Sequence, residues 1–251
     1  MPNCTMTRKI HDEVWYSLGK QDPDWAVVST PGKELGGWLP ELDRFYEEGR
    51  ERVAEAIELL PVEPDKERAL DWGSGTGRLS FALRSRGFKH VTCVDISTSM
   101  LDRLKERAAE RGINGLDLIE VSKFEPRGDH DLALSLITLQ HFPSREAIAE
   151  AVTTMVTGLK VGGFVVIEIP IRPHTLRYRI QPRLQVYRVL RRMGVAPMSL
   201  HARGFSGISM LCIPSQWVID LLEGAGTEVL QVRERCGTSH QMAHYAAVRV
   251  I

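Results

Sequence analysis

The residues with the clearest chemical meaning lie between Asp71 and Arg78, in the stretch DWGSGTGR. Gly73, Gly75 and Gly77 alternate there behind an apolar run and ahead of a helical one, a pattern typical of a turn around a phosphate. A dinucleotide-binding turn, however, needs a glycine where Arg78 stands, and an acid directly before the turn would repel a pyrophosphate. The stretch therefore favours a positively charged ligand that the backbone approaches closely.

This stretch resembles the first motif, DxGxGxG, of the class I S-adenosylmethionine (SAM)-dependent methyltransferases. SAM agrees with the charge argument, because its methionine end carries an ammonium group and a sulfonium. The resemblance implies that SAM is the cofactor and that the turn wraps its methionine end. The residues concerned are Asp71, Gly73, Ser74, Gly75, Thr76 and Gly77.

Later parts of the chain resemble the same family in the same order. Asp95 ends an apolar run where the family carries an acid, which implies that its two oxygens accept hydrogen bonds from the ribose hydroxyls. The resemblance also implies that Ile96 and Met100 flank the adenine on one side, and Lys123 and Phe124 on the other. For Met100, packing in the core is an open alternative.

The N-terminal segment is similar to the leading segment of bacterial methyltransferases associated with polysaccharide and secondary-metabolite gene clusters, where it closes over SAM. This similarity implies that Trp38 contacts the cofactor and that Arg50 pairs with its carboxylate. Alternatives stay open for both residues: apolar packing within a lid for Trp38, and an exposed ion pair with Glu47 on a helix for Arg50.

Methyl transfer is an in-line displacement from a good leaving group, so the enzyme mainly supplies proximity and alignment. A hydroxyl acceptor also benefits from a general base, for which His141, Glu168 and His240 are the candidates, with His244 close to the last of them. His141 and Glu168 follow predicted parallel strands at the end where open α/β sheets bind ligands. That position favours His141, although a hydrogen bond to a neighbouring loop would explain it equally.

Apolar runs alternate with amphipathic segments after residue 67, which predicts a parallel sheet covered by helices on both faces. Strands are expected at 68–72, 91–95, 116–121, 131–137 and 163–169, and helices at 41–60, 77–86, 98–112, 143–158 and 214–225. The last two strands, at 227–234 and 242–250, lack a helix between them and should pair antiparallel at the sheet edge. The predicted fold is therefore α/β, with a doubly wound, seven-stranded, mostly parallel sheet.

Two segments lie outside this alternation. Residues 1–62 are predicted to form an N-terminal lid and helix, and residues 63–251 the SAM-binding domain. A cap insert at about 171–210, after the fifth strand, should cover the mouth of the site. From Ile169 to Ile219 the chain has eight arginines and no aspartate, glutamate or lysine. These arginines are either a solvated face or contacts to an acidic acceptor.

The cap also shows helical periodicity, which Pro182 should divide into two pieces. Most of its arginines lie off the stripe of apolar residues that repeats at helical spacing. The stripe consists of Leu176, Ile180, Leu184, Tyr187, Leu190 and Met193.

Composition and missing motifs exclude several classes of protein. The 32 basic and 32 acidic side chains cancel, so global charge gives no reason to expect a nucleic-acid partner. We find no box of the amino-methylating DNA enzymes, no double-glutamate hairpin of the arginine methyltransferases and no metal-ligand cluster, so no metal is expected. Four scattered cysteines and the lack of a long apolar run or signal peptide predict a cytoplasmic protein without integral membrane association.

The sequence thus predicts SAM-dependent methylation of a small molecule, at a hydroxyl of a secondary metabolite or a sugar-type substrate, with an acidic or phosphorylated acceptor as one form of it. N- or C-methylation is an alternative. So is a protein of this fold that binds SAM without transferring methyl, as a cyclase or a scaffold. A modifier of macromolecules is a third hypothesis, which depends only on the arginine-rich cap. The oligomeric state is not predicted.

Overall fold

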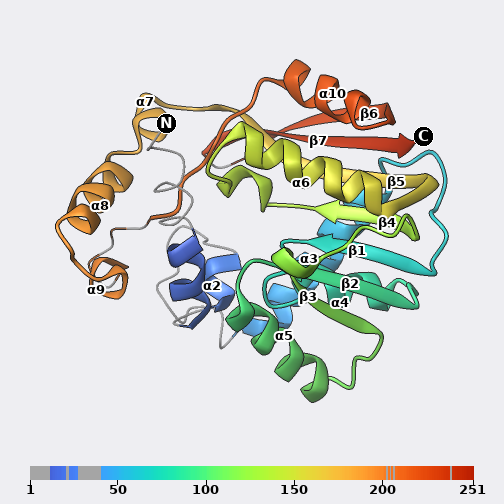
Figure 1. Ribbon diagram of the computed structural model, residues 1–251, viewed down its shortest axis with the longest axis horizontal. Helices are drawn as coiled ribbons and strands as arrows, with labels where there is room; N and C mark the ends of the chain where they lie inside the picture. Colours follow the sequence, from blue (N-terminus) through green and yellow to red (C-terminus); the bar gives the residue numbers. More distant parts are fainter. Residues whose placement is uncertain are drawn as a thin grey trace.

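The fold is built on one seven-stranded sheet, whose order is β3-β2-β1-β4-β5-β7-β6 (Figure 1). A computed structural model describes residues 12–20, 23–27, 41–201, 203, 205, 207–237 and 239–251. The strands are β1 (Arg68–Trp72), β2 (His90–Asp95), β3 (Leu116–Glu120), β4 (His130–Ser135), β5 (Leu159–Pro173), β6 (Thr227–Cys236) and β7 (His240–Arg249). Strands β1 to β5 pair in parallel, and β7 runs antiparallel to both β5 and β6. The predicted α/β fold and its antiparallel final pair are confirmed.

Helices cover both faces of this sheet. They are α3 (Leu42–Ile57), α4 (Arg78–Ser85), α5 (Thr98–Glu110), α6 (Arg145–Gly158) and α10 (Ser215–Gly224). Side chains alternate along each strand, so Leu132 and Leu134 of β4 pack in the cluster with α3, α4 and α5. Ala133 packs in the other cluster, with α6 and α10. The predicted boundary at residue 62 falls between α3 and β1 and stays a prediction.

Strand β5 is longer than the predicted strand at 163–169, and its partner explains the difference. Beyond Pro170 the antiparallel ladder with β7 continues, with Arg172 opposite Gln241 and Pro173 opposite His240. The register shifts between Pro170 and Arg172, where the chain carries a proline, a residue without a backbone N–H. Pairing with β7, which is far along the sequence, therefore extends β5 beyond residue 169, where the local periodicity predicted its end.

The cap forms three short helices, α7 (Leu176–Ile180), α8 (Pro182–Arg192) and α9 (Pro197–His201). Pro182 is the first residue of α8, so the predicted division at this proline is confirmed. Figure 1 shows α7, α8 and α9 together at one end of the molecule, beyond the end of the sheet. Tyr187 of α8 is buried in a cluster with Val14 and Leu18, which lie on a helix over residues 12–20.

Two further observations concern the described residues alone. None of the helices among them combines the length and the apolar character that a membrane crossing requires. None of the histidines, cysteines and acids in the same ranges gather in groups of three or more that could hold a metal ion.

Candidate cofactor and active site

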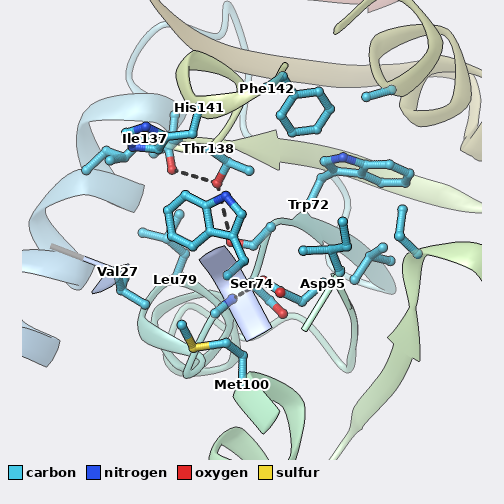
Figure 2. Close-up of a pocket in the computed structure, with 18 of the residues that line it drawn as sticks. Val27, Trp72, Ser74, Leu79, Asp95, Met100, Ile137, Thr138, His141 and Phe142 are labelled. Carbon is cyan, nitrogen blue, oxygen red and sulfur yellow. Dashed lines mark hydrogen bonds between the residues drawn. The ribbon is translucent and has the colours of Figure 1, made fainter. Parts of the chain in front are cut away.

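A pocket lies at the carboxyl ends of β1, β2 and β4, where the connections from neighbouring strands leave to opposite faces of the sheet (Figure 2). Its described lining comes from the turn after β1, the end of β2, the segment after β4, the start of α4 and one face of α6. The helix over residues 12–20 and helix α2 (Pro23–Val27) complete it through Trp15, Ala26 and Val27. Elements far apart in the sequence thus meet at one place.

The glycine turn is held in a conformation and a space that suit glycine alone. Gly73 has a φ of +80°, and a Cβ on it would collide with the side chain of Thr138. The backbone N–H groups of Gly73 and Ser74 donate to the carbonyl oxygen of Val94, at 2.7 and 3.0 Å. The turn is therefore attached to β2 and lies directly against the segment that follows β4.

Asp71 lies fully buried beneath this turn and is not part of the described lining. Its Oδ2 accepts a hydrogen bond from Ser80 Oγ at 2.5 Å, whereas Oδ1 has no hydrogen-bond partner. Burial raises the pKa of Asp71 to about 6. The predicted role at the methionine end is therefore limited to an electrostatic one, acting through the turn.

Asp95 lies in the lining at the end of β2, with its carboxylate held in one orientation (Figure 2). Oδ2 accepts from the Gly75 N–H and Oδ1 from the Ser97 N–H, both at 2.8 Å. Burial raises the pKa of Asp95, and these backbone hydrogen bonds act against that rise. Each oxygen keeps a further lone pair, so the group can accept hydrogen bonds from a diol.

The predicted adenine neighbours divide into residues that line the pocket and residues that do not. Ile96 and Met100 line it, and so does Val121. Lys123 is outside the lining, exposed and paired with Glu120 at 3.2 Å. Phe124 is also outside, because it packs edge-on against the ring of Trp72, with centroids 5.5 Å apart. The short helix η2 (Val121–Lys123) turns Val121 inwards at the place where Lys123 and Phe124 were expected.

Thr76 and Gly77 support the pocket from outside its lining. Thr76 Oγ1 donates to Asp24 Oδ1 at 3.0 Å, and Asp24 also forms a buried ion pair of 2.5 Å with Arg107. Gly77 is the N-cap of α4, and a Cβ on it would meet Leu104. These residues therefore fix α2 and α4 around the turn.

The two predicted contacts from the N-terminal segment differ in outcome. Trp38 lies outside the described residues. Arg50 is exposed on α3, where it pairs with Glu47 and takes no part in the lining. The structure thus places Arg50 in the arrangement that the sequence left open as its alternative.

Arg78 is the one residue of the described lining that carries a lysine or arginine side chain. In the sequence, position 78 drew notice only because it lacks the glycine of a dinucleotide-binding turn. Its side chain is 4% exposed, its Nε has no hydrogen-bond partner, and its guanidinium lies 5.5 Å from the ring centroid of Phe45. Burial, and then the charge of Arg52, lowers the pKa of Arg78 to about 10. A buried, unpaired cation in a pocket wall is costly and calls for an anion.

His141 lies in the lining, at the end of helix η3 (Leu139–His141). Its Nδ1 is 2.8 Å from the carbonyl oxygen of Ser209, which can only accept, so Nδ1 carries the proton. Nε2 therefore holds the lone pair, and the Gln140 amide donates to it at 2.9 Å. The ring of Trp15 covers the imidazole, with centroids 5.3 Å apart. This histidine has the tautomer that a general base needs.

Glu168 occupies a different environment, outside the described lining. It is fully buried, with Oε2 2.6 Å from Arg52 Nη2 and Oε1 2.8 Å from Arg235 Nη2. Burial alone would raise the pKa of Glu168, but the charges of Arg52 and Arg235 outweigh it and lower that pKa. His244 Nε2 lies 3.7 Å from the same carboxylate. The geometry is that of a structural ion pair.

His240 is also outside the described lining. It is buried at the start of β7, with Nδ1 2.7 Å from Ser239 Oγ. Burial lowers its pKa. Its role as a base stays a prediction that this position does not favour.

Ile137 is a lining residue that the sequence reasoning missed. It follows β4 with a φ of +66°, an unusual conformation for a β-branched residue. Backbone strain of this kind collects at functional sites. Nothing in the residue type points to it, because isoleucine avoids that conformation.

Comparison with known proteins agrees with this geometry. Residues 69–163 match a family model described as "Methyltransferase domain". Among solved structures, the chain is similar to magnesium protoporphyrin IX methyltransferase (ChlM) from Synechocystis PCC 6803, with a TM-score of 0.63, 18% identity, and coverage of 96% of this chain and 99% of that one.

Two other solved structures share the fold. Phosphoethanolamine N-methyltransferase 2 of Haemonchus contortus matches with a TM-score of 0.59 and 15% identity, over 80% of this chain and 53% of that one. The [4+2]-cyclase SpnF matches with a TM-score of 0.57 and 16% identity, over 80% of each chain. Residues 69–163 therefore match a methyltransferase domain, and the solved structures share the fold of the chain. The two ChlM structures that match carry bound S-adenosylhomocysteine and SAM.

Proposed function

We propose that the protein transfers a methyl group from SAM to a hydroxyl group of a small molecule. The observation that carries this proposal is His141, whose Nε2 holds a lone pair in the same pocket as Asp95 and the glycine turn. A base in that place is useful for an oxygen acceptor, which must lose a proton as the new bond forms.

The lining supplies partners for each polar part of the cofactor. Asp95 would hold the ribose hydroxyls, while Ile96, Met100 and Val121 would enclose the adenine. The carboxylate of the methionine part would pair with Arg78, whose buried guanidinium has no ion pair among the described residues. Ser74 Oγ is another buried atom without a hydrogen-bond partner, and Ser74 belongs to the same lining.

In this arrangement SAM supplies the methyl group on a sulfonium, and the chain supplies position and a proton acceptor. The acceptor hydroxyl would donate its proton to His141 Nε2, displacing the amide of Gln140. The proton on Nδ1 stays there, hydrogen-bonded to the carbonyl oxygen of Ser209, which keeps the ring from turning. Apolar walls from Trp15 and Phe142 would exclude water from this end of the pocket.

The acceptor class follows from the same walls. Trp15, Trp72, Leu136 and Phe142 give the pocket an apolar character that supports a secondary metabolite with a phenol or an enol more than a sugar. None of the cap arginines is among the described lining residues, so the acidic-acceptor interpretation of the cap has no support from the pocket.

Labelled cofactor tests this proposal directly. The purified protein is incubated with SAM that carries a deuterated methyl group and with an extract of small molecules from its own cells, and products are analysed by mass spectrometry and NMR. A labelled methoxy product is expected. Label on nitrogen or carbon would instead support N- or C-methylation. SAM binding without any labelled product would favour a role without methyl transfer, an alternative that the fold shared with a cyclase supports.

A further inference from the structure

Helices α7 and α8 expose apolar side chains that the fold does not use. Leu176 and Ile180 lie one helical turn apart on α7, and Val186, Val189 and Met193 continue at spacings of three and four on α8 and directly after it. Their exposed fractions range from 41% to 73%. Exposed apolar residues on successive turns of neighbouring helices are typical of a surface that binds something.

Helix α8 therefore has two apolar faces rather than one. Leu184 and Tyr187 point into the protein, where Tyr187 packs against Val14. Val186 and Val189 lie on the other side of the helix and stay in solvent. The buried face is enough to attach the helix, so the described part of the chain does not account for the exposed face.

Arginines border the exposed face, without acids to neutralise them. No side-chain ion pair or hydrogen bond to a described residue is formed by Arg177, Arg179, Arg183, Arg188 or Arg192. Arg191, on the buried side of α8, is different, since it pairs with Glu13 at 2.5 Å. The surface of α7 and α8 is thus apolar along its middle and positive at its borders.

We propose that α7 and α8 form a docking surface for an anionic lipid bilayer. A basic helix with an apolar face lies in the headgroup region, where its apolar side chains reach the acyl boundary and its arginines meet lipid phosphates. Interfaces with proteins place both signs of charge opposite each other and use aromatic anchors. A surface of one sign, with aliphatic side chains between the charges, fits a continuous negative surface better.

This docking surface is linked by hydrogen bonds to the segment that holds His141. Gln181, between α7 and α8, donates from Nε2 to the carbonyl oxygen of Met210 at 2.8 Å. The neighbouring Ser209 carbonyl is the one that holds His141. A bilayer beneath α7 and α8 would therefore lie close to the segment that positions the proposed base, although docking itself needs neither cofactor nor acceptor.

Vesicle flotation with the full chain tests the proposal without any methyl transfer. The protein is mixed at low and at physiological salt with vesicles of phosphatidylcholine alone or with one third phosphatidylglycerol. Binding only to the anionic vesicles, weakened by salt, is expected. Because each surface arginine contributes about fivefold to such binding, the triple variant Arg183→Gln, Arg188→Gln, Arg192→Gln should bind about 100-fold more weakly. The double variant Val189→Gln, Met193→Gln should also lose binding, at either salt concentration.

A matched variant removes the same charge elsewhere. It combines Arg44→Gln, Arg103→Gln and Arg127→Gln. These arginines lie on α3, on α5 and in a loop, away from the cap. This control should float like the native protein, and circular dichroism and S-adenosylhomocysteine binding should be unchanged in all variants. Equal loss in the control, absence of binding at low salt, or retention on RNA or an acidic protein but not on vesicles would each overturn the proposal.

Discussion

Glu168 and Arg52 form a buried ion pair of 2.6 Å that joins β5 to α3. Arg235 on β6 binds the other carboxylate oxygen at 2.8 Å, so one acid connects three elements at the carboxyl edge of the sheet. The pair explains why a glutamate at the end of a parallel strand is a structural residue here. Replacing Glu168 should therefore lower the stability of the protein, whereas replacing a catalytic base would lower kcat.

Glu168→Gln should destabilise the protein by about 3 kcal/mol, because it removes the buried negative charge between Arg52 and Arg235 and leaves Arg52 with Glu55 alone. Chemical unfolding in urea measures this value. The lowered pKa of Glu168 adds a pH dependence: the stabilisation is present above the pKa of an unfolded glutamate and is lost as the pH falls through the folded value. Glu47→Gln, which breaks an exposed pair with Arg50, is the control and should cost at most about 0.5 kcal/mol. If Glu168→Gln lowered kcat and kept the stability, the ion-pair interpretation would be wrong.

Arg78→Met should weaken binding of S-adenosylhomocysteine about 10- to 100-fold, since a hydrogen-bonded charge pair with the ligand is lost. The measurement is isothermal titration of native protein and variant. Methylthioadenosine, which lacks the carboxylate, should bind both equally. Arg50→Gln serves as the matched control and should leave the affinity unchanged, because Arg50 pairs with Glu47 on the surface. An equal loss for both ligands would show that Arg78 acts on the fold instead of on the carboxylate.

His141→Gln should lower kcat about 10²- to 10⁴-fold on a hydroxyl acceptor, the usual contribution of a general base. The affinity for S-adenosylhomocysteine should stay within twofold, and added imidazole should restore part of the rate. His240→Gln should leave kcat unaltered, because its ring lies outside the described pocket lining. An unchanged kcat in His141→Gln would favour an acceptor that needs no base.

Asp71 should make cofactor binding depend on pH. Its folded pKa of about 6 lies above the usual 3.8, so below pH 6 the turn loses the negative charge that favours a cationic methionine end. SAM affinity should therefore fall as the pH drops from 7 to 5. The variant Asp71→Asn should bind SAM weakly at both pH values. For the apo protein the sign is the reverse: a raised pKa favours the protonated folded state, so the free energy of unfolding should rise, by about 3 kcal/mol at most, as the pH falls from 6 to 4. Titrations at several pH values check both trends.

Periodicity was sufficient to predict the sheet, because apolar alternation and strand length are local properties of the chain. The exceptions are places where a distant partner decides. Strand β5 continues past Ile169 only because β7 pairs with it, and that pairing joins residues some 70 positions apart along the chain.

The site shows the same division. The turn from Gly73 to Gly75, Asp95 and His141 lie in the lining because they follow strand ends, which the sequence reveals. The face of a helix that carries a cation is harder to predict. Arg50 lies on α3, and Arg78 is the first residue of α4. Helix α3 buries the side with Phe45 and Val53 and leaves Arg50 in solvent, whereas α4 buries Arg78. The partners of Glu168 come from α3 and β6, and no spacing in the sequence connects them.

The N-terminal helices touch the pocket at both of its ends. Val27 fills the space next to Gly75, and the ring of Trp15 lies tilted against His141. We expect a cofactor bound between those points to be covered by these two helices, so that its entry and departure would require them to move away. Turnover would then be limited by the opening of this cover, and the spent cofactor would leave no faster than the helices unpack from Met100 and Tyr187.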